Sequence, residues 1–145
     1  MNNKQLGTSW ERQACDILAK SGYWVHFITP DARGAQPFDV IAVKNKKAYA
    51  IECKTIVGGK RYFSMDRLED NQRMAFGRWV ACGNGEPIIL IKQVNDIISI
   101  KYVELLNLKK RVDLIEKRES DCIKINGYNV YGILADMIRG DKCEK

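Results

Sequence analysis

The sequence contains few of the residues that usually build structural metal sites or disulfide frameworks. It has a single histidine, His26, and its five cysteines stand at positions 15, 53, 82, 122 and 143 without a C-x-x-C spacing. A zinc site would require these scattered thiols to converge, and a disulfide framework would favour an even number of cysteines. The composition therefore predicts reduced thiols in a cytoplasmic protein, with His26 as an ordinary strand residue.

Long apolar runs are also missing. No segment approaches the roughly 18–20 consecutive apolar residues of a membrane span. The first ten residues, MNNKQLGTSW, contain no apolar signal segment. We therefore expect no membrane association. The net charge of +6 weakly favours a polyanionic partner, because basic side chains neutralise phosphates in nucleic-acid binding.

A length of 145 residues, with 46% apolar and 29% charged residues, fits one globular domain. Thr8-x-x-Glu11 matches a capping box, and Trp10 and Ala14 follow at helical spacing, so we expect a first helix at about residues 8–21. The further expected elements are strands at 23–29, 38–44, 47–54, 87–93 and 97–103, loops at 30–37 and 56–63, helices at 65–85 and within 104–119, a hairpin at 122–131 and a helix at 132–140. This order predicts an α/β fold with a mixed central sheet flanked by helices on both faces.

Residues 36–55, QPFDVIAVKNKKAYAIECKT, predict a buried hairpin with charged residues at one end. A two-residue turn at Asn45-Lys46 places Asp39 opposite Glu52, with Lys54 on the same face as Glu52. Directly opposed residues have Cβ atoms about 4.5–5.5 Å apart. A three-residue turn would shift the pairing by one position, so the prediction depends on the turn.

Two opposed carboxylates in a half-buried place repel each other, and a divalent cation offsets that repulsion better than Lys54 alone. Mg²⁺ held by Asp39 and Glu52, with the Cys53 backbone carbonyl as a further ligand, would polarise a phosphate and activate a bound water. Lys54 would orient that water or neutralise developing charge. The pattern thus indicates metal-assisted phosphodiester hydrolysis. The alternative is a chance E-x-K pair on an exposed strand.

The segment FDVIAV…AYAIECKT resembles the core of the PD-(D/E)xK nuclease superfamily, with an acid at the start of one strand and E-x-K on the next. The preceding GTSWERQACDILAKSGYWV is similar to the first helix of small archaeal Hjc-type Holliday junction resolvases. The following YFSMDRLEDNQRMAF is similar to the helix after E-x-K in RecU-type resolvases. The resemblance covers about residues 5–100, and it departs from the family at Phe38, where a proline would precede Asp39.

The resemblance implies a restriction-endonuclease-like core and a Mg²⁺-dependent endodeoxyribonuclease, with Mn²⁺ as a substitute ion. It implies cleavage of four-way junctions in DNA recombination and repair by a homodimer. It also implies roles for five residues. Asp39 and Glu52 are the implied metal ligands, Lys54 the basic catalytic residue, Glu11 a further acid near the metal, and Gln72 a polar residue near water or phosphate.

Several alternatives stay open from the sequence. Glu11 would serve only as the capping partner of Thr8, and Gln72 would be plain surface. Gly58-Gly59 predicts a mobile loop, on which Lys60 and Arg61 would contact phosphates or simply be solvated. We expect one nuclease domain over residues 1–145, with a core at about 5–103 and a C-terminal hairpin and helix at about 104–140. Another nuclease on the same core (restriction-like, repair or phage), or a non-catalytic DNA-binding protein, would also fit.

Overall fold

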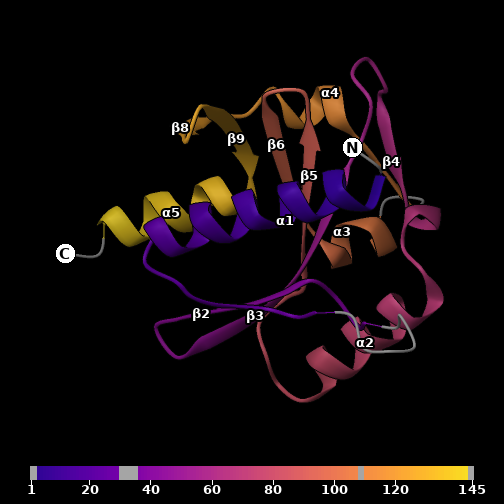
Figure 1. Cartoon of the computed structure of the whole chain (residues 1–145), viewed down its shortest axis with the longest axis vertical. Coiled ribbons are helices and arrows are strands. Elements are labelled where there is room, and N and C mark those ends of the chain that lie inside the picture. The colour runs from indigo at the N-terminus through magenta and orange to yellow at the C-terminus, as the bar shows by residue number, and fades with distance from the viewer. Residues whose placement is uncertain (1–2, 30–35, 108–109, 144–145) are drawn as a thin grey trace.

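A mixed seven-stranded sheet forms the centre of the fold in the computed structural model, which describes residues 3–29, 36–107 and 110–143 (Figure 1). The strand order is β1-β2-β3-β5-β6-β9-β8. β3 pairs antiparallel with β2 and parallel with β5, and β6 pairs parallel with β9. The strands are β1 (Trp24–Phe27), β2 (Val40–Lys44), β3 (Lys47–Thr55), β5 (Ile88–Gln93), β6 (Asp96–Lys101), β8 (Ile123–Ile125) and β9 (Tyr128–Gly132).

Helices cover both faces of this sheet, as the order of elements predicted. α1 (Asn3–Lys20) and α5 (Ile133–Cys143) pack on one face. The other face carries the remaining elements, which are η1 (Met65–Arg67), α2 (Asp70–Ala81), α3 (Tyr102–Asn107), α4 (Leu114–Lys117) and a small ribbon of β4 (Tyr62–Ser64) and β7 (Arg111–Asp113). Because both faces are covered, the central strands are apolar on both sides.

The hairpin of β2 and β3 has the predicted turn and register. Asn45 and Lys46 both have positive φ, 53° and 66°, as the tight type I′ turn requires. Lys44 pairs with Lys47, and the ladder runs to Val40 opposite Ile51. Asp39 comes one residue before that last pair. The turn, which lies at the far end of the hairpin, therefore sets the position of Asp39 relative to β3.

Four predicted boundaries were wrong. α1 begins at Asn3, so Thr8 lies inside the helix and cannot be its N-cap. The helix expected at 65–85 is divided, because Leu68 and Glu69 are extended and α2 restarts at Asp70. The loop expected at 56–63 contains β4, which pairs with β7. The segment within 104–119 is helical in part, as expected, with α3 and α4 on either side of β7. α5 continues to Cys143, where a frayed tail was expected.

Other expectations had mixed outcomes. The hairpin about Asn126-Gly127 forms, with Ile125 paired to Tyr128. Most of the loop expected at 30–37, including Arg33 and Gly34, lies outside the described residues. Within the described part of the chain, Cys15, Cys53, Cys82 and Cys122 are free thiols, as predicted. No helix of that part is long and apolar enough to cross a membrane.

Candidate active site

Two strands of the sheet and two helices bring the predicted site residues together. Asp39 stands directly before β2, and Glu52 and Lys54 lie near the end of β3. Glu11 reaches this end of the sheet from α1, and Gln72 reaches it from α2. Glu52 and Lys54 share one face because their positions differ by two. The E-x-K spacing therefore points a carboxylate and an ammonium group into the same space.

Glu52 is the most enclosed charged residue of the group, with 3% of its surface exposed. Its Oε2 atom accepts a hydrogen bond from Gln72 Nε2 at 2.6 Å and lies 3.2 Å from Lys54 Nζ. Its other oxygen, Oε1, is buried and has no hydrogen-bond partner among the described residues. A buried carboxylate oxygen without a partner is costly, so this atom is suited to bind a cation.

Asp39 is held by two hydrogen bonds from different directions. The backbone N–H of Cys53 donates to Oδ2 at 2.8 Å, and Gln36 Nε2 donates to Oδ1 at 2.7 Å. Gln36 is itself tied to α2, because Asn71 Nδ2 donates to its backbone carbonyl at 3.0 Å. The sequence offered no signal for Gln36, since a glutamine before a strand is common and its contact with Asp39 depends on the path of the loop.

Burial raises the pKa values of all three acids, and the Asp39 charge raises those of Glu52 and Glu11 further. Burial, followed by the Asp39 charge, raises the pKa of Glu52 to about 8, although Lys54 opposes this. Burial and the neighbouring Asp39 raise the pKa of Glu11 to about 7. Burial also raises the pKa of Asp39, while the Cys53 N–H lowers it. Fully ionised, the cluster would carry more negative charge than Lys54 can balance, so a bound cation would favour the ionised acids.

The donor set fits a hard divalent cation. No three acidic, histidine or cysteine side chains within the described residues converge closely enough to form a complete site by themselves. Mg²⁺, however, is usually held by one or two carboxylates and completes its shell with waters and substrate phosphates. Asp39 and Glu52, with the unpartnered Oε1 of Glu52, meet that requirement.

The structure contradicts the two alternatives in which Glu11 only caps Thr8 and Gln72 is plain surface. Glu11 is not a capping residue, because the helix starts well before Thr8. Gln72 is not plain surface, since only 7% of it is exposed and it contacts Glu52. Gln72 also caps α2, where its side-chain Oε1 accepts from the backbone N–H of Glu69 at 3.1 Å. Glutamate is not among the usual N-cap residues, so Glu69-x-x-Gln72 is not recognisable as a capping box from the sequence.

Comparison with known proteins agrees with this geometry. Residues 2–135 match the family model of the archaeal Holliday junction resolvases (Hjc), which extends the resemblance beyond the first hundred residues. The structure is similar to that of Hjc, a Holliday junction resolvase from the archaeal hyperthermophile Archaeoglobus fulgidus. That match has a TM-score of 0.62 at 16% identity and covers 92% of this chain and 98% of that one. No curated protein sequence matches significantly.

The family model spans most of the chain, and the similar structure has the same fold. The helix–strand–hairpin order, with Asp39 before β2 and Glu52-x-Lys54 on β3, is the arrangement that the sequence likeness led us to expect. The chain belongs to the family of archaeal Holliday junction resolvases, which are nucleases that act on branched DNA.

Proposed function

We propose that this resolvase is a Mg²⁺-dependent endonuclease whose catalytic centre consists of Glu11, Asp39, Glu52, Lys54 and Gln72. The observation that carries the proposal is the Glu52 carboxylate. It is 3% exposed, lies among acids with raised pKa values and keeps one oxygen without a partner. A buried carboxylate with an unpartnered oxygen costs folding free energy, whereas a bound divalent ion would supply the missing partner.

Asp39 and Glu52 are the proposed metal ligands, with the Cys53 backbone carbonyl and Glu11 as further candidates. The Cys53 backbone lies beside the Asp39 carboxylate, since its N–H donates to Oδ2. Bound Mg²⁺, for which Mn²⁺ would substitute, would supply Lewis acidity toward the phosphate and lower the pKa of water. This chain provides the carboxylates, their spacing and a largely buried setting.

Lys54 and Gln72 have separate proposed roles. The Lys54 ammonium lies 3.2 Å from Glu52 and is partly exposed, so it can contact both the carboxylate and an incoming phosphate or water. Gln72 donates to Oε2 of Glu52, so Oε1 would be the oxygen available to bind the ion. Gln36 donates to Oδ1 of Asp39 and so orients that carboxylate, whose Oδ2 accepts from the Cys53 N–H.

The decisive experiment is a cleavage panel with a four-way junction, a flap, a single strand and a linear duplex, each with and without Mg²⁺. Preferential cutting of the junction with Mg²⁺ supports the proposal, and cutting without any divalent ion contradicts it. Asp39→Asn and Glu52→Gln should abolish cleavage while junction binding in Ca²⁺ persists. Lost binding, or lost folding, would indicate a structural role for these acids instead.

We also propose a homodimer of single-domain subunits, because paired cuts on opposite strands require two centres. The C-terminal strands β8 and β9 extend the same sheet as the site residues, which supports one domain over residues 1–145. The sheet has two edges, β1 with Trp24 62% exposed, and β8. Sedimentation equilibrium of Trp24→Lys and Ile123→Lys would show which edge, if either, holds the subunits together.

Since its proposed substrate is cellular DNA, we propose a cytoplasmic location.

A further inference from the structure

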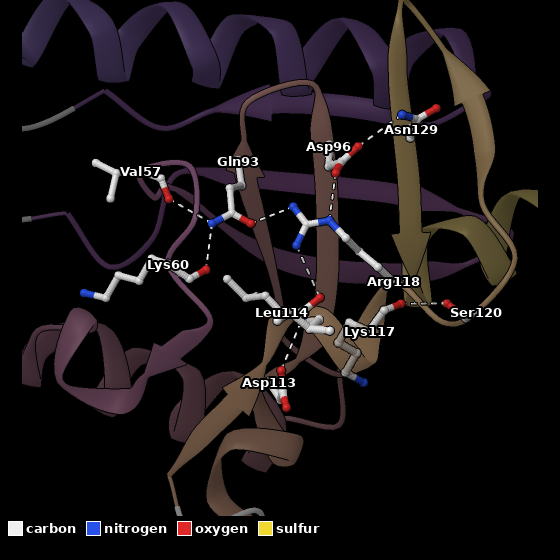
Figure 2. A network of polar contacts seen from close by, with 11 residues as sticks. Val57, Lys60, Gln93, Asp96, Asp113, Leu114, Lys117, Arg118, Ser120 and Asn129 are labelled. Atoms are coloured by element: carbon white, nitrogen blue, oxygen red, sulfur yellow. Dashed lines mark hydrogen bonds and ion pairs between the residues drawn. The ribbon is translucent and has the colours of Figure 1, made fainter.

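A buried polar network joins the C-terminal part of the chain to the turn that follows Lys54 (Figure 2). Its centre is Gln93, the last residue of β5, which is 2% exposed. Gln93 Nε2 donates to the backbone carbonyls of Val57 and Lys60, both at 2.8 Å. Gln93 Oε1 accepts from Arg118 Nη2 at 2.6 Å. Both amide hydrogens are thus used on one turn.

The other side of the network is anchored on the sheet. Arg118 Nε donates to Asp96 Oδ2 at 2.7 Å, and Asn129 Nδ2 donates to Asp96 Oδ1 at 3.1 Å. Asp96 begins β6, and Asn129 belongs to β9. Because Arg118 uses its planar fork on both Gln93 and Asp96, the Gln93 amide is oriented so that its nitrogen faces the turn.

The turn needs this support. Gly59 has φ of 87°, as the third residue of a type II turn from Val57 to Lys60 requires. The turn's own hydrogen bond, from Lys60 N to Val57 O, is long at 3.4 Å. Directly after the turn, Leu114 N donates to Arg61 O at 2.7 Å. The segment expected to be a mobile loop is therefore a turn held mainly by Gln93.

This turn lies at the same end of the central strands as the candidate active site. β3 and β5 run parallel, with Thr55 opposite Lys92, and Ile56 N donates to Lys92 O at 3.0 Å. Gln93 is thus level with Ile56, just beyond Lys54. The three residues from Lys54 to Val57 span at most about 10 Å. The turn is therefore close enough to Lys54 for one DNA strand to contact both.

One cation on this turn is available for DNA. Lys60 is exposed, and its ammonium group has no hydrogen-bond or ion-pair partner within the described residues. Figure 2 shows its side chain directed away from Gln93. Arg61, by contrast, is committed to Asp113, to which its Nε and Nη2 donate at 3.1 and 2.8 Å. The turn therefore presents Lys60 toward solvent beside the candidate active site.

We propose that Gln93 is a positioning residue for DNA binding, which, through the Val57–Lys60 turn, holds Lys60 against a backbone phosphate next to the one that is cut. This rests on the proposed function, since it assumes that DNA reaches Lys54. A lysine on a preformed turn loses less conformational freedom when it binds than one on a flexible loop.

A double-mutant cycle in junction binding tests whether Gln93 and Lys60 act through the same contact. Gln93→Glu has the same shape and keeps its partner Arg118, but it cannot donate to the two carbonyls. Lys60→Gln removes the charge alone. Each single variant should weaken four-way-junction binding in Ca²⁺ roughly 3–10-fold and lower the salt slope by about one. The double variant should bind no more weakly than either single variant, because both act through the same contact.

The control is Lys46→Gln, which removes the same charge at the β2–β3 turn and should leave affinity unchanged. Cleavage by Gln93→Glu at saturating junction should stay within about twofold of the parent, since only binding is affected. Wild-type affinity of Gln93→Glu, or additive losses in the double variant, would overturn the proposal. Cleavage that survives Glu52→Gln would instead overturn the proposed function and leave these binding results intact.

A second variant covers the case in which Gln93→Glu fails to fold. Gly59→Ala strains the turn through its positive φ, and a Cβ there meets no atom within 4 Å. It should produce the same loss of affinity and salt slope with Gln93 intact. Normal binding by a folded Gly59→Ala, checked by its thermal unfolding, would contradict a role for the turn.

Discussion

Gln72 and Glu52 are joined by a hydrogen bond of 2.6 Å that links α2 to the middle strand of the site. The same glutamine stabilises the N-terminus of α2, because its Oε1 accepts a hydrogen bond from the backbone N–H of the N-cap residue Glu69. The Gln72 side chain thus holds both the N-terminus of α2 and the orientation of the Glu52 carboxylate. The start of α2 and the orientation of Glu52 are therefore coupled.

Replacing Gln72 by alanine should lower the cleavage rate about 10–100-fold, because residues that orient a ligand commonly have effects of that size. The matched control is Glu69→Ala, which removes the reciprocal half of the cap but makes no contact with Glu52. Both variants should lose about 1 kcal/mol of stability. Single-turnover cleavage and urea unfolding of both variants measure the two effects. An equal loss of cleavage in Glu69→Ala would assign the effect to the helix.

Divalent-ion binding should strengthen as the pH rises from 6 to 8. Glu11 and Glu52, with pKa values raised to about 7 and about 8, hold protons that must leave before a cation binds. Calorimetry with Ca²⁺, in buffers of different ionisation enthalpy, measures the affinity and the protons released. Glu52→Gln should release fewer protons. Equal affinity at pH 6 and pH 8 would show that the acids are already ionised.

In EDTA, the free energy of unfolding should fall as the pH rises between about 5 and 8. The folded pKa of Glu52, about 8, lies above its ordinary value of 4.5, so over this range the folded state binds more protons than the unfolded state. Glu52→Gln removes this penalty, and should stabilise the protein at pH 8 by on the order of 2–4 kcal/mol but little at pH 5. Exposed Glu119→Gln is the control. Denaturant unfolding at pH 5 and pH 8 measures the stability of each variant. An equal stabilisation by Glu52→Gln at both pH values would contradict the prediction.

Gly132→Ala should destabilise the fold severely, by at least about 3 kcal/mol. Gly132 has φ of 92°, and a Cβ there would lie 2.0 Å from the backbone oxygen of Ser99. The clash falls where Ser99 Oγ also caps the start of α5 by accepting from Leu134 N. Gly140→Ala, with open space around it in α5, should instead stabilise by about 0.5–1 kcal/mol. The urea unfolding midpoints of the two variants measure these changes. A loss of stability well below about 3 kcal/mol in Gly132→Ala would mean that β9 shifts easily to relieve the clash.

The local parts of the site were predictable from the sequence. Asn45-Lys46 fixed the hairpin register, and alternation then placed Glu52 and Lys54 on one face. The mixed sheet with helices on both faces followed from the order of elements. These features depend on residues that are near one another in the chain, where turn chemistry and periodicity decide the structure.

The unpredicted parts depend on contacts between distant segments. β4 and β7 are three residues each and pair across nearly fifty positions, so neither has enough periodicity to be recognised alone. Gln36 and Gln93 are ordinary polar residues in the sequence. Their importance comes from the carbonyl and carboxylate groups that the fold places beside them.

The positive φ values of Asn45 and Lys46 have a consequence for how this hairpin can vary among natural sequences. Adding one residue to so short a connection, without a compensating bulge, would turn every later side chain of β3 over. Glu52 would then face α1 and Cys53 would face α2. Length changes tolerated at this turn should therefore come in pairs, because the turn at the other end of the hairpin sets which face of β3 carries Glu52.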